Sequence, residues 1–296
     1  MRRLLTALVV LAAVIVAAGL WITRPRHADP AEFAGLSGDP GRGAQVFWAA
    51  GCASCHTAEG AAPAEMPVLA GGRRFDSDFG SFTAPNISPD PDAGIGRWSL
   101  ADLADALREG TDRAGRHLYP AFPYASYTHA SAQDIADLYE FLMTLPPDPT
   151  PNRPNDVRFP FSIRQGIGLW KALYLTDGWA VPGPLSPEAE RGRYLVEALG
   201  HCAECHTPRD AMGGLDRDRW LAGVPGPDGR GGPPNLTPGA LDWSEEEIAE
   251  YLSSGFTPDY DSAGGEMAEV VSNFARLPAA DRLAVAAYLK AVPAVE

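Results

Sequence analysis

Two cysteine pairs, each followed directly by a histidine, are the residues of this sequence whose types and spacing point most clearly to a chemistry. The segment 52–56 reads Cys-Ala-Ser-Cys-His, and the segment 202–206 reads Cys-Ala-Glu-Cys-His. Two thiols separated by two residues can add to the two vinyl groups of a haem, and the adjacent histidine then supplies the proximal nitrogen ligand of the iron. The pattern therefore predicts two covalently bound haem c groups. Their attachment residues would be Cys52, Cys55, Cys202 and Cys205, and their iron ligands His56 and His206.

Other uses of such cysteine pairs are a disulfide, as in thioredoxin-like proteins, and a zinc site. A disulfide is compatible with an exported protein, but it does not explain why a histidine follows both pairs. A structural zinc site needs four ligands, and each cluster offers two cysteines and one histidine with no obvious fourth. All four cysteines of the chain lie in these pairs, so haem attachment accounts for the whole cysteine content.

The second motif has a candidate ligand for the opposite side of the iron. Met267 lies well downstream of His206, after Gly264, Gly265 and Glu266. A thioether ligand favours ferrous iron and raises the reduction potential. A single methionine is also a common core filler, but the flanking glycines predict a loop, where a ligand is the better interpretation. We expect His206 and Met267 to hold the second iron between them.

The chain also repeats itself outside the cysteine motifs. Pro-Asn-Ile-Ser-Pro at 85–89 matches Pro-Asn-Leu-Thr-Pro at 234–238, and Trp-Ser occurs at 98–99 and again at 243–244. A duplicated domain explains these matches better than chance does. Each copy has roughly 110 residues, a size at which short helices joined by Gly- and Pro-rich loops bury little apolar surface without a cofactor.

The repeat fixes the domain organisation that we expect. We call the first copy the first unit and the second copy the second unit, and we name the remaining parts by their composition. The boundaries are 1–26 for a signal-anchor helix, 27–38 for a linker, 39–147 for the first unit, 148–185 for a Pro-rich linker with an apolar strap, and 186–296 for the second unit.

The repeat also shows where the two units differ. Phe122 stands in the first unit at the position of Met267, and phenylalanine cannot bind iron. His117, five residues earlier, would give a bis-histidine haem, and a vacant or labile sixth position is an equal alternative. His129 and Met66 are further candidates, although Met66 follows the first motif closely and would need a special loop to reach the distal side.

Short-range signals predict mostly helices. Asp39 and Ser186 each precede a proline, as helix N-caps do. Ser99 and Ser244 each precede an acidic residue by three positions, which is a capping box, and a glycine suited to the helix end follows in both cases. Ser131 begins a further helix with one apolar face. Since no alternating run long enough for a sheet is present, the predicted fold class is all-α.

The N-terminal residues read as a targeting segment. Arg2 and Arg3 precede an uncharged apolar run from Leu4 to Ile22, and Arg24 follows. As a helix this run reaches ~28 Å, close to the ~30 Å hydrocarbon core of a membrane. Cleaved signal peptides usually have a shorter apolar region, so we favour an uncleaved anchor over a cleaved signal. In both cases the rest of the chain is exported.

Charge excludes one class of partner. All 38 acidic residues lie after Arg26, whereas only 20 of the 24 basic residues do, which leaves that part of the chain with a formal charge of −18. Binding to nucleic acid needs a basic face, so we expect no nucleic-acid partner. An acidic body would instead favour association with a basic face on a protein partner.

The linker contains an unusual apolar stretch. It begins with a stiff Pro-rich spacer, and residues 161–175 are then rich in apolar side chains. One interpretation is a docking surface for a partner subunit or the membrane interface. The other is a strap packed between the two units.

The motifs together resemble those of a known family. In addition to the cysteine pairs these are Pro-Asn-Ile-Ser-Pro-Asp at 85–90, Gly-Ile-Gly-Arg-Trp-Ser at 94–99 and Leu-Tyr-Pro-Ala at 118–121. The chain is similar to the membrane-associated multi-haem cytochrome c subunits of bacterial periplasmic dehydrogenases for alcohols, gluconate or aldehydes. Well-known members carry three haems and a methionine where Phe122 stands. The second departure resembles a branch linked to molybdenum hydroxylase-type dehydrogenases.

The resemblance covers about residues 39–296 and implies two tandem class I cytochrome c domains behind an N-terminal transmembrane anchor. It further implies that Trp98 and Trp243, or Asn86 and Asn235, hydrogen-bond haem propionates or order the distal loop. For the two tryptophans, hydrophobic staples before their capped helices are an equal alternative. In each unit a glycine of the first helix would let the last helix cross closely against an aromatic ring. These pairs would be Gly43 with Tyr139, and Gly192 with Tyr288.

These features together predict an electron-transfer protein of the bacterial inner membrane with its body in the periplasm. We expect it to take electrons from a periplasmic dehydrogenase subunit and to pass them to an oxidase or a soluble cytochrome, with the N-terminal helix in the membrane. The alternative is a haem enzyme of the di-haem peroxidase or thiosulfate-oxidising type. Its only support is the first haem, which lacks the expected methionine.

Overall fold

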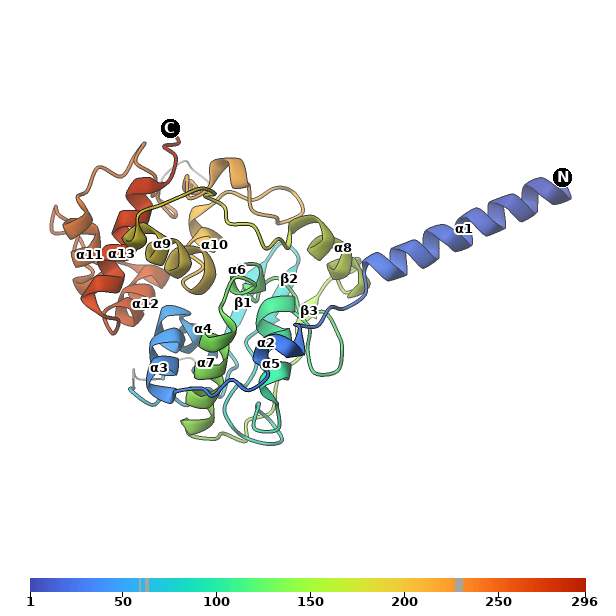
Figure 1. Ribbon diagram of the computed structural model, residues 1–296, viewed down its shortest axis with the longest axis horizontal. Coiled ribbons are helices and arrows are strands. Elements are labelled where there is room, and N and C mark those ends of the chain that lie inside the picture. Colours follow the sequence, from blue (N-terminus) through green and yellow to red (C-terminus); the bar gives the residue numbers. More distant parts are fainter. Residues whose placement is uncertain (59, 62–63, 227–230) are drawn as a thin grey trace.

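A long N-terminal helix projects from a rounded body in the computed structural model, which describes all residues except 59, 62–63 and 227–230 (Figure 1). This helix, α1, spans Arg2–Ile22 and has no buried residue. Its mean hydropathy of 2.7 makes it long and apolar enough to cross a membrane. The short helix α2 (Pro30–Phe33) follows and leads into the body.

Two sets of short helices form the body, and they follow each other along the chain (Figure 1). In the first unit the helices are α3 (Pro40–Ala49), α4 (Cys52–His56), α5 (Leu100–Glu109), α6 (Tyr124–Tyr127) and α7 (Ala132–Thr144). In the second unit they are α9 (Pro187–Arg193), the π-helix η1 (Tyr194–Leu199), α10 (Ala203–His206), the 3₁₀-helix η2 (Arg217–Arg219), α11 (Glu245–Ser254), α12 (Gly265–Phe274) and α13 (Ala279–Ala291).

The helices begin and end where the local signals predict. Both capping boxes are complete, and Gly110 and Gly255 end their helices in the left-handed conformation with φ of 55° and 80°. Five N-cap side chains each accept a hydrogen bond from the backbone N–H three residues later. These N-caps are Asp39, Ser99, Ser131, Ser186 and Ser244.

In each unit the first and last helices cross at a glycine. A Cβ on Gly192 would lie 1.8 Å from a backbone carbonyl oxygen of α13 and 2.7 Å from Cβ of Tyr288, which confirms that predicted pair. A Cβ on Gly43 would lie 2.8 Å from Cβ of Phe141, so the predicted partner Tyr139 is wrong. Residues two apart on a helix point in different directions. The Tyr139 hydroxyl instead donates to the carbonyl oxygen of the residue before the α5 N-cap (2.9 Å).

A small antiparallel sheet departs from the all-α prediction. Strands β1 (Arg74–Ser77) and β2 (Gly80–Thr83) form a tight hairpin, and β3 (Asp156–Val157) from the linker pairs with β2. Each strand has at most four residues, too few to give an alternating pattern in the sequence. The fold is therefore predominantly helical, with a hairpin in the first unit that the linker extends.

The linker packs against both units through α8 (Gln165–Tyr174). Its Lys171 Nζ donates to the carbonyl oxygens of Glu109 and Gly110 in the first unit (2.6 and 2.7 Å). Its Trp170 Nε1 donates to the carbonyl oxygen of Met212 in the second (3.1 Å). One face of α8 therefore contacts both units.

Candidate haem sites

The two cysteine pairs lie on short helices that directly follow the first helix of each unit. All four cysteines are free thiols, and Cys52 and Cys202 pack against the hydrophobic core. Burial raises the pKa of both to about 12. Neither pair forms a disulfide.

The adjacent histidines are oriented identically in the two units. His56 Nδ1 donates to the carbonyl oxygen of Pro85, and His206 Nδ1 donates to that of Pro234, both at 2.8 Å. Such a bond fixes the tautomer and leaves Nε2 to bind a metal. Burial lowers the pKa of both rings, so the neutral form that binds iron is favoured.

This donor set fits a covalent haem and does not fit zinc. Each motif offers two thiols and an imidazole whose Nδ1 is already engaged, as a haem c with a proximal histidine requires. Within the described part of the chain, no group of three or more His, Cys, Asp or Glu side chains is arranged to hold a metal ion.

Met267 lies in the first turn of α12, after the glycines that precede the helix. The prediction that it lies in a loop is therefore wrong, since Gly264 is the N-cap and Gly265 the first helical residue. Its side chain is half-buried and packs against the core. In the first unit, Phe122 directly precedes the N-cap of the short helix α6, and its ring lies 5.5 Å from that of Tyr127.

The His117 side chain contacts the segment that follows α1. Its Nε2 donates to the carbonyl oxygen of Thr23, the residue after α1, at 2.8 Å. It also forms an isolated β-bridge with Thr111, as Ser262 does with Phe256 in the second unit. The second-unit counterpart of His117 is thus an exposed serine.

The other two candidates for the first haem also have different surroundings. The His129 ring stacks on Trp179 of the linker with centroids 4.5 Å apart, and Met66 is 45% exposed. Burial lowers the pKa of His129 to about 4.

Asn86 and Asn235 form hydrogen bonds with the segment that follows the last helix of each unit. Asn86 Nδ2 donates to the carbonyl oxygen of Asp148 (2.8 Å), and Asn235 Nδ2 donates to that of Val295 (2.8 Å). Their side-chain oxygens accept backbone N–H groups two residues later. The amide groups are used within the protein, so the propionate interpretation is not supported.

The two cysteine motifs meet at the interface between the units. The carbonyl oxygen of Ala50, two residues before Cys52, accepts hydrogen bonds from the Tyr127 hydroxyl (2.9 Å) and from His201 Nε2 (3.3 Å). His201 directly precedes Cys202 and adopts φ of 41°, unusual for a residue with a side chain. A short chain of bonds therefore joins the two haem-attachment helices.

Further contacts lock α12 onto the first motif. Arg73 Nη1 donates to the Glu269 carboxylate (2.7 Å) and to the carbonyl oxygen of Ser54. Asn273 Nδ2 donates to Ser54 Oγ (2.9 Å). Burial raises the pKa of Cys55 to about 11, and Cys205 of the other unit adds to that shift. Sequence reasoning missed all these residues, because no short-range pattern indicates a contact between units.

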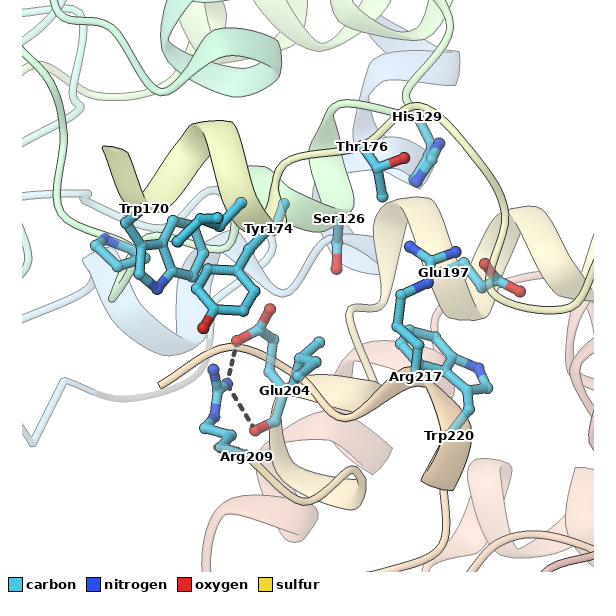
Figure 2. Close-up of a pocket in the computed structure, with 14 residues that line it drawn as sticks. Ser126, His129, Trp170, Tyr174, Thr176, Glu197, Glu204, Arg209, Arg217 and Trp220 are labelled. Atoms are coloured by element: carbon cyan, nitrogen blue, oxygen red, sulfur yellow. Dashed lines mark hydrogen bonds and ion pairs between the residues drawn. The ribbon is translucent and has the colours of Figure 1, made fainter. Parts of the chain in front are cut away.

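A cavity of about 110 Å³ lies beside the second motif, lined by residues of both units and the linker (Figure 2). The first unit contributes Ser126 and His129, and the second contributes Glu204, which pairs with Arg209. Glu197 lies at its edge and accepts the backbone N–H of Ala180 at 2.6 Å. Glu197 belongs to the π-helix η1, a rare geometry. These bonds hold the linker against the second unit.

Comparison with known proteins identifies relatives of the chain. The family model described as Cytochrome c matches residues 41–146 and 189–293. A protein named diheme cytochrome c-type from Cereibacter sphaeroides is 59% identical over 100% of both chains. One of the subunits of nicotinate dehydrogenase from Pseudomonas putida is 43% identical over 85% of this chain and 21% of its own length. The fructose dehydrogenase cytochrome subunit from Gluconobacter japonicus is 36% identical over 86% of this chain and 52% of its own. The chain thus spans only part of the two dehydrogenase subunits.

Proposed function

The chain belongs to the cytochrome c family, and on this premise we propose that it is an electron carrier of the bacterial inner membrane with its body in the periplasm. It carries two covalently bound haem c groups. The observation that carries the proposal is the duplicated site. In each copy a histidine stands beside two cysteines, and its Nδ1–H donates a hydrogen bond to a proline carbonyl oxygen at 2.8 Å. When bound, haem c supplies a one-electron couple between ferric and ferrous iron.

We assign the attachment and ligand roles to the residues of the two motifs. The two domains would be 39–147 and 186–296, with the class I fold, joined by the linker 148–185. The first haem would be held by Cys52, Cys55 and His56, and the second by Cys202, Cys205 and His206, with Met267 as its sixth ligand. The half-buried position of Met267 in the first turn of α12 supports this role.

The first haem would differ in its sixth position. Phe122 packs on Tyr127, and the His117 imidazole donates to Thr23. We therefore favour a position without a strong protein ligand over a bis-histidine haem. A methionine ligand raises the potential, so the second haem would be the higher-potential site of the pair.

The contact between the two motifs supports electron transfer from one haem to the other. Ala50 and His201 each lie within two residues of an attachment cysteine, and a hydrogen bond of 3.3 Å joins them. The cysteine-bearing edges of the haems would then face each other across the interface. This arrangement suits an electron carrier.

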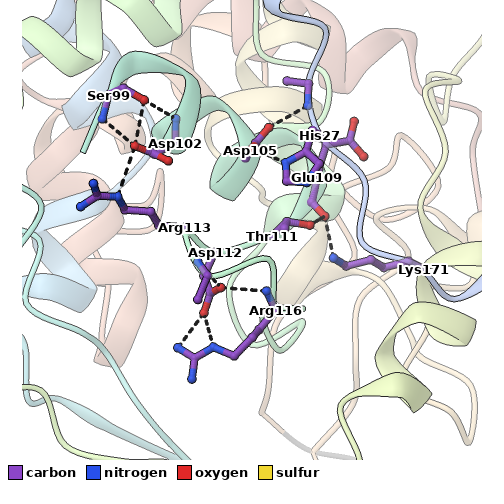
Figure 3. Close-up of polar contacts among 12 residues, drawn as sticks. His27, Ser99, Asp102, Asp105, Glu109, Thr111, Asp112, Arg113, Arg116 and Lys171 are labelled. Atoms are coloured by element: carbon purple, nitrogen blue, oxygen red, sulfur yellow. Dashed lines mark hydrogen bonds and ion pairs between the residues drawn. The ribbon is translucent and has the colours of Figure 1, made fainter. Parts of the chain in front are cut away.

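The contacts that follow α1 support an uncleaved anchor. Thr23 accepts a hydrogen bond from the buried His117, and the Asp105 carboxylate accepts bonds from His27 Nδ1 (2.6 Å) and the Ala28 N–H (2.8 Å) (Figure 3). Removing residues 1–26 would leave the His117 imidazole without its partner. The segment after α1 is therefore part of the folded body rather than a loose leader.

The names of the relatives suggest the electron donor. Two of them are subunits of dehydrogenases for nicotinate and for fructose. We propose that a periplasmic dehydrogenase subunit supplies electrons to this chain, and that an oxidase or a soluble cytochrome accepts them. The acidic body suits a partner with a basic docking face.

The test is a redox titration of the purified full chain in detergent, with spectra recorded for each haem. We expect two one-electron steps and a methionine–iron charge-transfer band that belongs to the higher-potential step. Met267→Ala should abolish this band and lower that step, whereas Met212→Ala, at an exposed methionine of the same unit, should change neither. Survival of the band in Met267→Ala would overturn the ligand assignment, and rapid peroxide turnover by the reduced protein would favour an enzyme.

A further inference from the structure

The linker carries an exposed apolar surface beside the end of α1, and we propose that this surface dips into the lipid bilayer. The inference rests on the proposed membrane anchor. We call the surface the strap patch. It consists of Phe159, Phe161, Ile163, Leu169 and Leu173, whose exposed fractions are 80%, 46%, 49%, 49% and 61%.

Helix α8 has apolar side chains on both faces, because Ile167 and Trp170 are buried while Leu169 and Leu173 are exposed. A surface helix normally turns its charged residues to water and its leucines to the core. Here Lys171 points inward to the end of α5, whereas Leu169, Ala172 and Leu173 are exposed. Such an outward apolar face is unfavourable in water and is typical of a helix that lies on a membrane.

The position of α8 places the strap patch at the membrane surface. A Cβ on Gly168 would lie 2.4 Å from the carbonyl oxygen of Thr23, so the backbone of α8 touches the residue that follows α1. Figure 1 shows α8 beside this end of α1. A helix is ~10 Å wide, and an interfacial helix is buried to a depth of ~5–10 Å. The patch therefore begins within one helix width of the point where α1 leaves the bilayer.

The strap patch is held rigidly in this position. Lys171 Nζ donates to the carbonyl oxygens of Glu109 and Gly110, at the C-terminal end of α5 (Figure 3). Arg164 donates to the carbonyl oxygen of His117, whose ring binds Thr23. The same cluster thus fixes both α1 and the strap patch, so the patch cannot turn away from the membrane while α1 spans it.

The lack of acidic residues around the strap patch also favours contact with anionic lipid headgroups. Residues 158–176 contain no acidic residue, although the chain has 38, and their charged side chains are Arg158, Arg164 and Lys171. Arg158 is exposed, and a basic side chain beside an apolar surface attracts anionic headgroups, whereas Lys171 is buried against α5. Trp21 is 64% exposed, with the Arg24 guanidinium 4.9 Å from its ring centroid, which marks the interface level on α1.

The experiment uses the full di-haem chain in vesicles of phosphatidylethanolamine and phosphatidylglycerol that contain a phospholipid with a diazirine near the acyl carbonyl. After photolysis and trypsin digestion, we expect lipid adducts on α1 and on the peptides 159–164 and 165–171. The control is the loop between α11 and α12, which lies on the other side of the body from α1 (Figure 1). Its Phe256 and Tyr260 are 57% and 90% exposed, and we expect no adducts there.

The outcomes separate this inference from the anchor on which it rests. Adducts on α1 with none on 159–171 above the control loop would overturn the strap patch and leave the anchor standing, and a protein partner would then cover this surface. Absence of adducts from α1 as well would overturn the anchor. In a variant with serine at 159, 161, 169 and 173, labelling of the patch should be lost while labelling of α1 stays unchanged. Since all four side chains are exposed, their replacement leaves the core intact.

Discussion

Gly43→Ala is the sharpest test of how the first unit holds together. Gly43 lies where α3 crosses α7, and a Cβ there would be 2.0 Å from the carbonyl oxygen of Asp137 and 2.8 Å from Cβ of Phe141. Neither atom lies at the free end of a flexible side chain. The two helices must therefore move apart to accept the methyl group, and their packing is lost along the crossing.

The expected cost follows from two opposing effects. Overpacking a close contact typically costs about 1–3 kcal/mol, and we take the upper end because the clash involves backbone. Alanine recovers ~1 kcal/mol of helix propensity relative to glycine. The net loss is ~2 kcal/mol, which for a domain of about 100 residues corresponds to a fall of roughly 10 °C in the unfolding temperature.

The assay is thermal and urea unfolding of the di-haem protein in mild detergent, followed by circular dichroism and by haem absorbance. The matched control is Gly41→Ala in the same helix, where the nearest atom to the new Cβ is a carboxylate oxygen of Asp39 at 3.1 Å. The unfolding temperature of this control should be close to that of the natural protein. If Gly43→Ala unfolds at the same temperature as Gly41→Ala, the reasoning about the crossing is wrong.

Three further predictions concern charge and capping. The pKa of Asp137 is pushed up by burial but falls below its usual value overall, because Arg42 Nε and the Asp39 N–H donate to the carboxylate, both at 2.7 Å. Its contribution to stability should be complete at neutral pH and lost as the pH falls from about 4 through the lower folded pKa, and urea midpoints for Asp137→Asn should lack this acid dependence. Ser244→Ala removes the capping box of α11 and should lower the free energy of unfolding by about 1 kcal/mol in the same assay. Finally, a cationic redox mediator should reduce the acidic body more slowly as ionic strength rises through ~0.1 M, where the Debye length is ~10 Å, and a constant stopped-flow rate would contradict electrostatic steering.

Local chemistry made much of the fold predictable. The N-caps at Asp39 and Ser99 and the glycine ends at Gly110 and Gly255 depend on residues within one turn of each other, so the sequence alone contains the information. The internal repeat then extended each local match to the other unit. For the same reason the adjacent cysteines and histidines could be assigned from their spacing.

Contacts between distant residues were not predictable in this way. Nothing near Arg73 or Glu269 in the sequence indicates that they pair across the unit interface at 2.7 Å. The helical position of Met267 was hidden by two preceding glycines, which read as a loop although they form the start of α12. The position along the repeat decides which side chain faces the glycine, and Phe141, not Tyr139, stands at the repeat position of Tyr288.

The segments that precede Met267 and Phe122 differ between the two units, and the difference involves the attachment of α1. In the second unit the residue five positions before Met267 is Ser262, which is exposed. The corresponding residue in the first unit is His117, which is buried and donates to Thr23 at the end of α1. The segment before Met267 in one unit thus corresponds to a segment that supports the N-terminal helix in the other. In the first unit the segment fixed against α1 is thus also the one in which Phe122 stands at the position of Met267.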